Sequence, residues 1–140
     1  ADSFALEKDN ETFGIGGLDY ELGSKSYPSF KNLSDQHFNI YLYHNTDLID
    51  YFSDVPIDLY LCGHSHGGQI ALPFYGALFT QLRHGKKYEA GLYKVNHYRL
   101  YVNRGIGMAA GLFPKVRIFA KPEITVFDIV PENPQNTNPD

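Results

Sequence analysis

The chain alternates between short apolar runs, rich in aromatic and β-branched residues, and longer polar stretches rich in glycine and proline. Apolar runs of this length that end at turn residues predict β-strands. Two such runs lie within residues 1–22, around Phe4 and around Phe13. The polar stretch Glu7–Thr12 between them predicts a β-hairpin, and a polar loop is expected over residues 23–37.

The next two runs predict a strand–helix–strand unit. Asn39–Tyr43 and Asp58–Cys62 are almost wholly apolar, as expected of buried strands. Between them apolar residues recur at helical spacing, which predicts a short helix over 47–53 with Thr46 as its N-cap. A connection of this length suits parallel strands, which are usually neighbours in one sheet. Their carboxyl ends then lie at the same edge.

The remaining chain predicts more strands and a tail. Residues 70–87 are expected to be a loop. Gly91–Val95 and Arg99–Val102 predict one strand pair, and Val116–Ala120 with Ile124–Val130 predict another. The fold class is therefore α/β. Residues 131–140 contain too few apolar groups to pack and are expected to be disordered.

Composition limits the classes of function that fit the chain. The chain has 140 residues, of which 43% are hydrophobic, and carries a formal charge of -4. This fits one domain or part of one, and argues against nucleic-acid binding. No apolar run is long enough to cross a membrane, so a cytoplasmic or peripheral membrane location is expected. Cys62 is the only cysteine, and we expect it to be a small buried apolar residue.

Histidines follow both buried strands. His44 comes directly after the first strand, and the segment GHSHGGQ, with His64 and His66, comes directly after the second. An extended backbone would point His64 and His66 to the same side, and neutral imidazole is a common metal ligand. A lone His-x-His pair also fits chance or a polar strand edge, but His44 at the matching strand end favours a metal site.

These residues resemble a known family. GHSHGGQ, with His44 in YLYHNTDLID, is similar to the last two metal motifs of calcineurin-like metallophosphoesterases, in a branch of bacterial, often membrane-associated enzymes. The segments IALPFYG, EAGLY, LYVNRGIG and VRIFAKPEITVFDI extend the likeness. The resemblance implies that residues 1–130 form the C-terminal part of a metallophosphoesterase domain. That part is half of a four-layer α/β/β/α sandwich.

The resemblance also implies an activity. It is hydrolysis of a phosphomonoester, phosphodiester or pyrophosphate by a hydroxide activated on two divalent ions, which would be Mn, Fe or Zn. The substrate would be a phosphorylated small molecule or a lipid-linked compound. By resemblance, His44 and His64 would bind one ion and His66 the other. Four further residues would shape the loop or contact substrate, although Arg104 also fits a plain turn residue: Gly67, Gly68, Gln69 and Arg104.

Several family motifs are missing. The early Asp-x-His, Gly-Asp-x-x-Asp and Gly-Asn-His segments do not occur, and Asp35-Gln36-His37 precedes a strand instead of ending one. Three imidazoles cannot neutralise or bridge two dications, so no complete catalytic set is expected and the isolated chain should be inactive or weak. We therefore expect association with a missing N-terminal half, or self-association.

Two alternatives remain open at this stage. One is a mononuclear zinc hydrolase with three histidine ligands, and the other is a non-catalytic binding fragment. In addition, Phe74, Tyr75 and Phe79 fit either ordinary loop residues or a lip that faces lipid.

Overall fold

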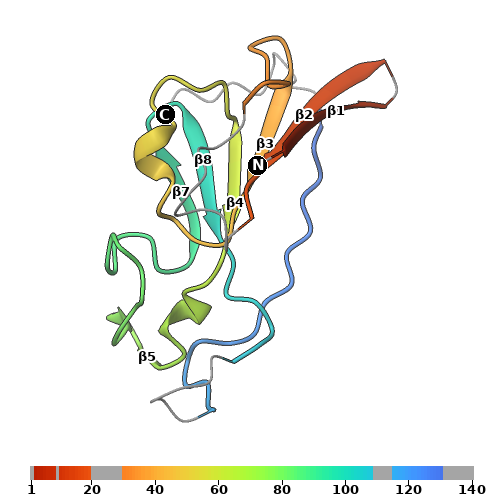
Figure 1. The fold of residues 1–140 in the computed structure, drawn as a ribbon. Coiled ribbons are helices and arrows are strands. Elements are labelled where there is room, and N and C mark those ends of the chain that lie inside the picture. Colours follow the sequence, from red (N-terminus) through yellow and green to blue (C-terminus); the bar gives the residue numbers. More distant parts are fainter. Residues whose placement is uncertain (1, 9, 20–29, 109–114, 131–140) are drawn as a thin grey trace.

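The computed structural model describes residues 2–8, 10–19, 30–108 and 115–130. Its main body is one mixed six-stranded sheet, and a smaller lobe of irregular chain lies beyond one end of the strands (Figure 1). This arrangement is compatible with the expected α/β class. The elements, in chain order, are β1 (Asp2–Lys8), β2 (Glu11–Gly17), β3 (Phe38–Leu42), η1 (Ile49–Tyr51), β4 (Leu59–Cys62), η2 (His66–Gly68), β5 (Ala71–Leu72), β6 (Gly76–Ala77), β7 (Gly91–Val95) and β8 (Tyr98–Val102).

The strand order is β1-β2-β3-β4-β8-β7. β1 pairs with β2, and β7 with β8, in antiparallel hairpins, whereas β2, β3, β4 and β8 run parallel to one another. The expected hairpin in residues 1–22 is confirmed, as are the parallel pairing of the two buried strands and the hairpin of Gly91–Val95. Parallel pairing places the carboxyl ends of β3, β4 and β8 at the edge that meets the smaller lobe.

Glycines in β2 let the next strand pack closely. A Cβ added at Gly14 would lie 2.0 Å from Asn39 Oδ1, and one at Gly16 would lie 2.7 Å from the Tyr41 ring. The close backbone approach expected of glycines in a strand therefore occurs here.

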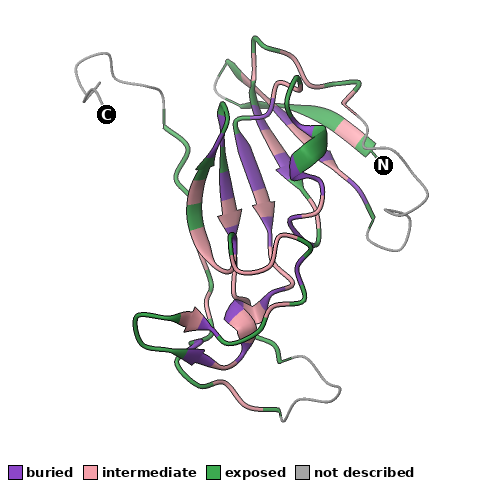
Figure 2. Ribbon diagram, turned by 90° about the vertical axis from the view of Figure 1, so that its left-hand side faces the viewer, coloured by how far each residue is buried: buried purple, intermediate pink, exposed green. Residues whose placement is uncertain are grey.

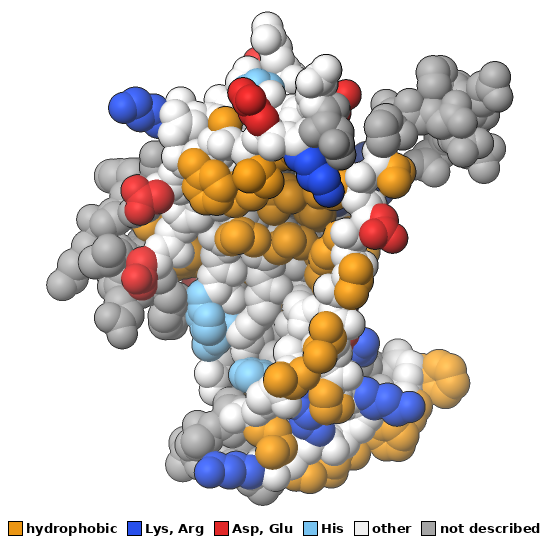
Figure 3. Space-filling model, turned by 90° about the vertical axis from the view of Figure 1, so that its right-hand side faces the viewer, with side chains coloured by type: hydrophobic (Ala, Val, Ile, Leu, Met, Phe, Trp, Pro, Cys, Tyr) orange, Lys and Arg blue, Asp and Glu red, His pale blue; other side chains and the backbone are white. Residues whose placement is uncertain are grey.

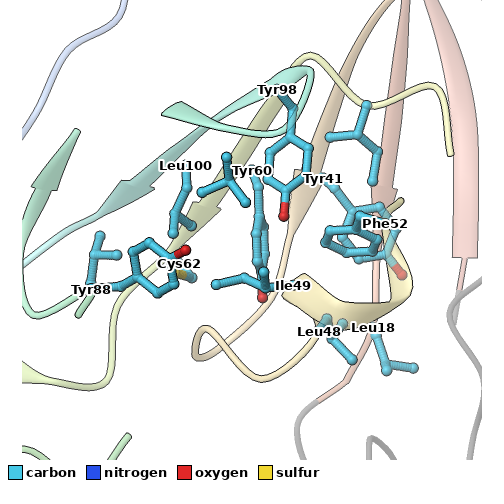
Figure 4. Close-up of a cluster of buried hydrophobic side chains, with 13 residues drawn as sticks. Leu18, Tyr41, Leu48, Ile49, Phe52, Tyr60, Cys62, Tyr88, Tyr98 and Leu100 are labelled. Atoms are coloured by element: carbon cyan, nitrogen blue, oxygen red, sulfur yellow. The ribbon is translucent and has the colours of Figure 1, made fainter. Parts of the chain in front are cut away.

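One face of the sheet carries the core. Tyr41, Tyr60 and Tyr98 project from three strands and pack around Phe52, which lies just after η1 (Figure 4). All four are at most 1% exposed, and the aromatic pairs adopt edge-on geometry, which contributes about 0.5–1.5 kcal/mol per pair beyond area burial. Burial alternates along β8, as expected of a strand with one core-facing side (Figure 2).

The opposite face is apolar and exposed over much of its area, although Phe127 packs on Tyr101 of β8. Phe38, Leu42 and Leu92 are 37%, 45% and 59% exposed, and register places Leu42 beside Leu61 and then Tyr101. Hydrophobic side chains form a band across this face in the space-filling view (Figure 3). The sheet is therefore one layer with a second apolar surface, and the four-layer arrangement remains an expectation.

Three expectations about elements are wrong. The helix expected over 47–53 is only the 3-10 turn η1, and Thr46 accepts from Ile49 N–H through its backbone oxygen, not its side chain. Val116–Ala120 and Ile124–Val130 do not pair as strands, because Ile118 and Phe119 bridge singly to Ile70 instead. The loop over 70–87 includes the two-residue strands β5 and β6. The expected tail, 131–140, lies outside the described residues.

Candidate metal centre

The end of the β3–β4 ladder brings two histidines together. Gly63 N–H donates to His44 O at 3.0 Å, which extends the pairing one step beyond the strands. As a result His44 Nε2 and His64 Nδ1 lie 2.7 Å apart, at hydrogen-bond distance. Histidine side chains are visible at the surface where the sheet meets the smaller lobe (Figure 3).

The loop after β4 is tightly turned, not extended. φ is 69° at His64, 50° at His66 and 57° at Gln69, and both intervening glycines are also left-handed. Strand alternation is therefore the wrong reason for placing His64 and His66 on one side. Left-handed backbone at residues other than glycine is strained, and clusters of such strain are typical of functional sites.

Packing requires glycine at the centre of this loop. A Cβ at Gly67 would lie 2.9 Å from Arg104 Cδ, and a Cβ at Gly68 would lie 2.4 Å from Ala77 Cβ. Gly67 N–H donates to Ser65 Oγ at 3.2 Å, and Gly68 N–H donates to Ser65 O at 2.7 Å. These amides are engaged within the loop, so both glycines shape it without offering donors to an anion.

All three imidazoles are in an environment that favours the neutral form. Burial, and then the neighbouring His64, lower the pKa of His44. Burial and His66 lower the pKa of His64, with the Asp47 carboxylate acting in the opposite direction. Burial and Arg117 lower the pKa of His66. A neutral imidazole is the form that ligates metal.

Arg117 holds His66, which the sequence did not indicate. Its Nη2 donates to His66 Nδ1 at 3.3 Å and its Nη1 to His66 O at 3.1 Å. The same guanidinium donates to the backbone oxygens of Arg104, Gly105, Gly107 and Ala120. A single arginine in an apolar stretch has no local pattern that reveals such a role.

Arg104 is committed to a carboxylate. Its Nε donates to Glu123 Oε2 at 2.7 Å, and the two side chains are 38% and 13% exposed. Arg104 lies in the turn after β8, which fits the turn residue that the sequence also allowed. Its aliphatic stem packs against Gly67. Cys62 is buried as expected, and burial raises the pKa of its thiol to about 12.

The donor set fits a single divalent ion better than two. Two imidazole nitrogens on one tetrahedral ion would lie roughly 3.3 Å apart, given metal–nitrogen distances of roughly 2.0–2.1 Å. His44 Nε2 and His64 Nδ1, 2.7 Å apart, would need to separate by about half an ångström to share an ion. In the described ranges, no three His, Cys, Asp or Glu side chains come together as a ligand group. A dinuclear site needs bridging carboxylates that these residues do not supply.

A pocket opens beside the histidines. It adds Phe79 and Gln81 to the site. The sequence gave no indication of a role for Gln81. Its lining comprises His64, Ser65, His66, Gly68, Gln69, Phe79 and Gln81.

Comparison with known proteins identifies the family. The chain is 45% identical over 127 residues to the uncharacterized metallophosphoesterase YkuE of Bacillus subtilis, covering 89% of this chain and 43% of that protein. It is 39% identical over 89 residues to the phosphodiesterase YaeI of Escherichia coli, covering 64% and 31%. It is 35% identical over 105 residues to the UDP-2,3-diacylglucosamine pyrophosphatase LpxG of Chlamydia muridarum, covering 70% and 31%.

This chain belongs to the calcineurin-like metallophosphoesterase superfamily. It spans less than half the length of these relatives, and the partial coverage fits the expected C-terminal part. No family model matches the chain, and no solved structure is detectably similar to it. Among the described residues, no helix is long and apolar enough to cross a membrane.

Proposed function

We propose that this chain supplies the imidazole half of a metal-dependent phosphoesterase site. The observation that carries the proposal is the pair His44 and His64, 2.7 Å apart at the carboxyl ends of two adjacent parallel strands. Ligand sites in open α/β sheets form at such ends. The left-handed loop beside the pair adds the strain that accompanies functional sites.

The residues of this chain have separate parts in the proposed site. His44 and His64 hold one divalent ion through neutral imidazole nitrogens, and His66 is assigned to a second, which requires its Nδ1 to exchange Arg117 Nη2 for the ion. Gly67 and Gly68 allow the tight left-handed turn that directly follows His66. A bound divalent ion would supply Lewis-acid stabilisation of negative charge on a phosphate.

We further propose that the bridging carboxylates come from a polypeptide segment other than residues 1–140. The limited coverage of the relatives supports this, as does the open apolar face with Phe38, Leu42 and Leu92 exposed. That face ends at the edge that holds the histidines, so a partner packed on it would be close to them. A missing N-terminal half is the proposed occupant, and a second copy of the chain is the alternative.

For substrate, we propose the phosphodiester or pyrophosphate class. Two relatives, a phosphodiesterase and a UDP-2,3-diacylglucosamine pyrophosphatase, act on these bonds according to their names. A phosphorylated lipid-linked compound is the more specific candidate, and the apolar side chain of Phe79 in the lining of the pocket is compatible with it.

A chimera tests the proposal. The segment of YaeI that matches this chain is replaced by the corresponding residues of this chain, and hydrolysis of bis(p-nitrophenyl) phosphate is measured with added Mn²⁺. We expect activity that falls at least about a hundredfold in His64→Ala, because a ligand of the ion is lost. The matched control is His97→Ala, since His97 is exposed in the β7–β8 turn and lies outside the site.

The controls make failure informative. Circular dichroism and elution volume establish that the chimera and both variants are folded. A folded chimera without activity, beside active unmodified YaeI, would contradict the proposal. Equal activity in the His64→Ala and His97→Ala variants would contradict the assignment of His64.

A further inference from the structure

A second surface is built at the far end of the smaller lobe. Four apolar side chains around the β5–β6 hairpin project into solvent, and we refer to them as the apolar tip. Their exposed fractions are 45%, 110%, 60% and 51% for Leu72, Phe74, Tyr75 and Leu78. Apolar and basic side chains both gather on this lobe in the space-filling view (Figure 3). Contiguous apolar surface of this kind marks an interaction site.

The exposed residue Phe74 has a strained backbone conformation. Tyr75 N–H donates to Leu72 O at 3.3 Å, which closes a turn with Pro73 and Phe74 at its centre. φ of Phe74 is 66°, and glycine or asparagine is favoured at such a position. Phe74 is therefore both strained and fully exposed with respect to the described residues, which is the pattern expected of a side chain that contacts an external partner.

The tip is held in place by charged residues. Ala77 N–H donates to Glu89 Oε2 at 3.0 Å, and a Cβ at Gly76 would lie 1.9 Å from Glu89 Oε1. Lys86 Nζ donates to Tyr75 O at 2.8 Å and sits 3.3 Å from the centre of the Tyr75 ring. The hairpin is therefore a preorganised element that carries a cation directly beside its aromatic residues.

Charge is strongly segregated toward this lobe. Residues 63–90, 103–108 and 115–121 contain seven of the chain's 12 Lys and Arg but only one of its 16 Asp and Glu, namely Glu89. Two of the seven pair with carboxylates outside these ranges, Arg83 with Asp50 and Arg104 with Glu123. The net charge of -4 thus conceals a basic lobe and an acidic remainder. Lys86 and Lys87 follow the hairpin, so positive charge flanks the apolar tip, whereas Arg83 pairs with Asp50 at 3.4 Å.

We propose that the apolar tip docks on an anionic lipid bilayer. Aromatic side chains flanked by Lys and Arg are suited to the membrane interface, where rings sit at headgroup level and cations meet acidic lipids. Exposed Leu72 and Leu78 favour acyl chains over nucleic acid, since bases stack on aromatic rings but not on aliphatic side chains. Docking would bring the pocket beside His64 and His66 to the membrane surface, because Phe79 follows the tip and lines that pocket.

A tryptophan reporter tests this directly. The chain has no tryptophan, so Phe74→Trp introduces a single emitter at the tip without disturbing packing. The matched control is Phe4→Trp, since Phe4 is 54% exposed and belongs to the edge strand β1, which lies away from the smaller lobe (Figure 1). Both variants are titrated with vesicles of phosphatidylcholine alone, with vesicles containing phosphatidylglycerol, and with single-stranded DNA.

We expect a blue shift, and quenching by brominated acyl chains, only for Phe74→Trp and only with anionic vesicles. Adding Lys86→Gln and Lys87→Gln should weaken this binding by on the order of tenfold or more, since each basic residue at an anionic surface contributes substantially. Absence of a shift with every vesicle would overturn the proposal. So would a response to DNA alone, or an equal response of both reporters to the same vesicles.

Discussion

At the scale of single residues, the loop after β4 is governed by backbone conformation. Five of its positions, from His64 to Gln69 with Ser65 excepted, have positive φ, and only two of these are glycine. The two glycines are also the positions where a side chain would collide with its surroundings. Sequence spacing alone shows two histidines and a glycine pair. It does not show that the glycines are required by contact with Ala77 and Arg104.

Gly68→Ala tests that requirement. The added Cβ would lie 2.4 Å from Ala77 Cβ at a φ of 75°, so we expect a loss of about 2–4 kcal/mol in the free energy of unfolding, from strain and overpacking together. Gly85→Ala is the matched control, because Gly85 has a φ of 59° with nothing within 4 Å. It should lose only about 1 kcal/mol. Urea unfolding of both variants measures the difference, and equal losses would show that packing against Ala77 is unimportant.

At the scale of elements, the strands were predictable and the connections were not. Asn39–Tyr43 and Asp58–Cys62 are continuously apolar after their first residue, and such runs have few alternatives to a buried strand. Ile124–Val130 is equally rich in β-forming residues, yet it makes no ladder. It is held by side chains instead, since Tyr101 contacts Glu123, Thr125 and Phe127. Strand propensity depends on a partner strand, which local sequence does not reveal.

The candidate site was predictable to a similar extent. Parallel strands and their lengths were enough to place His44 beside His64. The turn conformation of the loop, the hold of Arg117 on His66 and the pairing of Arg104 with Glu123 all involve contacts between distant segments. No spacing rule in one sequence encodes those contacts.

The Arg104–Glu123 pair makes the stability of the fold depend on pH. Partial burial acts to raise the pKa of Glu123, but hydrogen bonds from Tyr101 and Thr125, with the Arg104 guanidinium, lower it overall. A carboxylate whose folded pKa is depressed stabilises the fold above its unfolded pKa, about 4.3 for Glu. That contribution is lost as pH falls through the lower, folded pKa.

Comparison with Glu123→Gln measures this contribution. We expect the wild-type protein to be the more stable at pH 7, and the gap in unfolding free energy to shrink as the pH is lowered below about 4.3. Glu7→Gln serves as the control, since Glu7 is exposed on β1, and its gap should stay near zero. A Glu123→Gln gap that is constant with pH, or that grows on acidification, would contradict the assigned charge state.

At the scale of the whole molecule, one face of the sheet is buried under the core, and two other surfaces expose apolar side chains. The core side of the sheet is closed by Phe52 and its aromatic neighbours. The opposite face and the apolar tip both expose hydrophobic side chains, and they lie on different parts of the molecule (Figure 3). Between them lies the histidine edge. This arrangement fits a protein that completes its site with another polypeptide segment and meets substrate at a different surface.

The central claim is that His44, His64 and His66 are part of a site and not the whole of it. The most direct test is to count metal per chain after the purified protein is equilibrated with Mn²⁺ or Zn²⁺ and dialysed. His64→Ala is measured in parallel, with His97→Ala as the control. We predict no more than one weakly held ion per chain, lost in His64→Ala and unchanged in His97→Ala. Two ions retained per chain, or one that is indifferent to His64→Ala, would contradict the account.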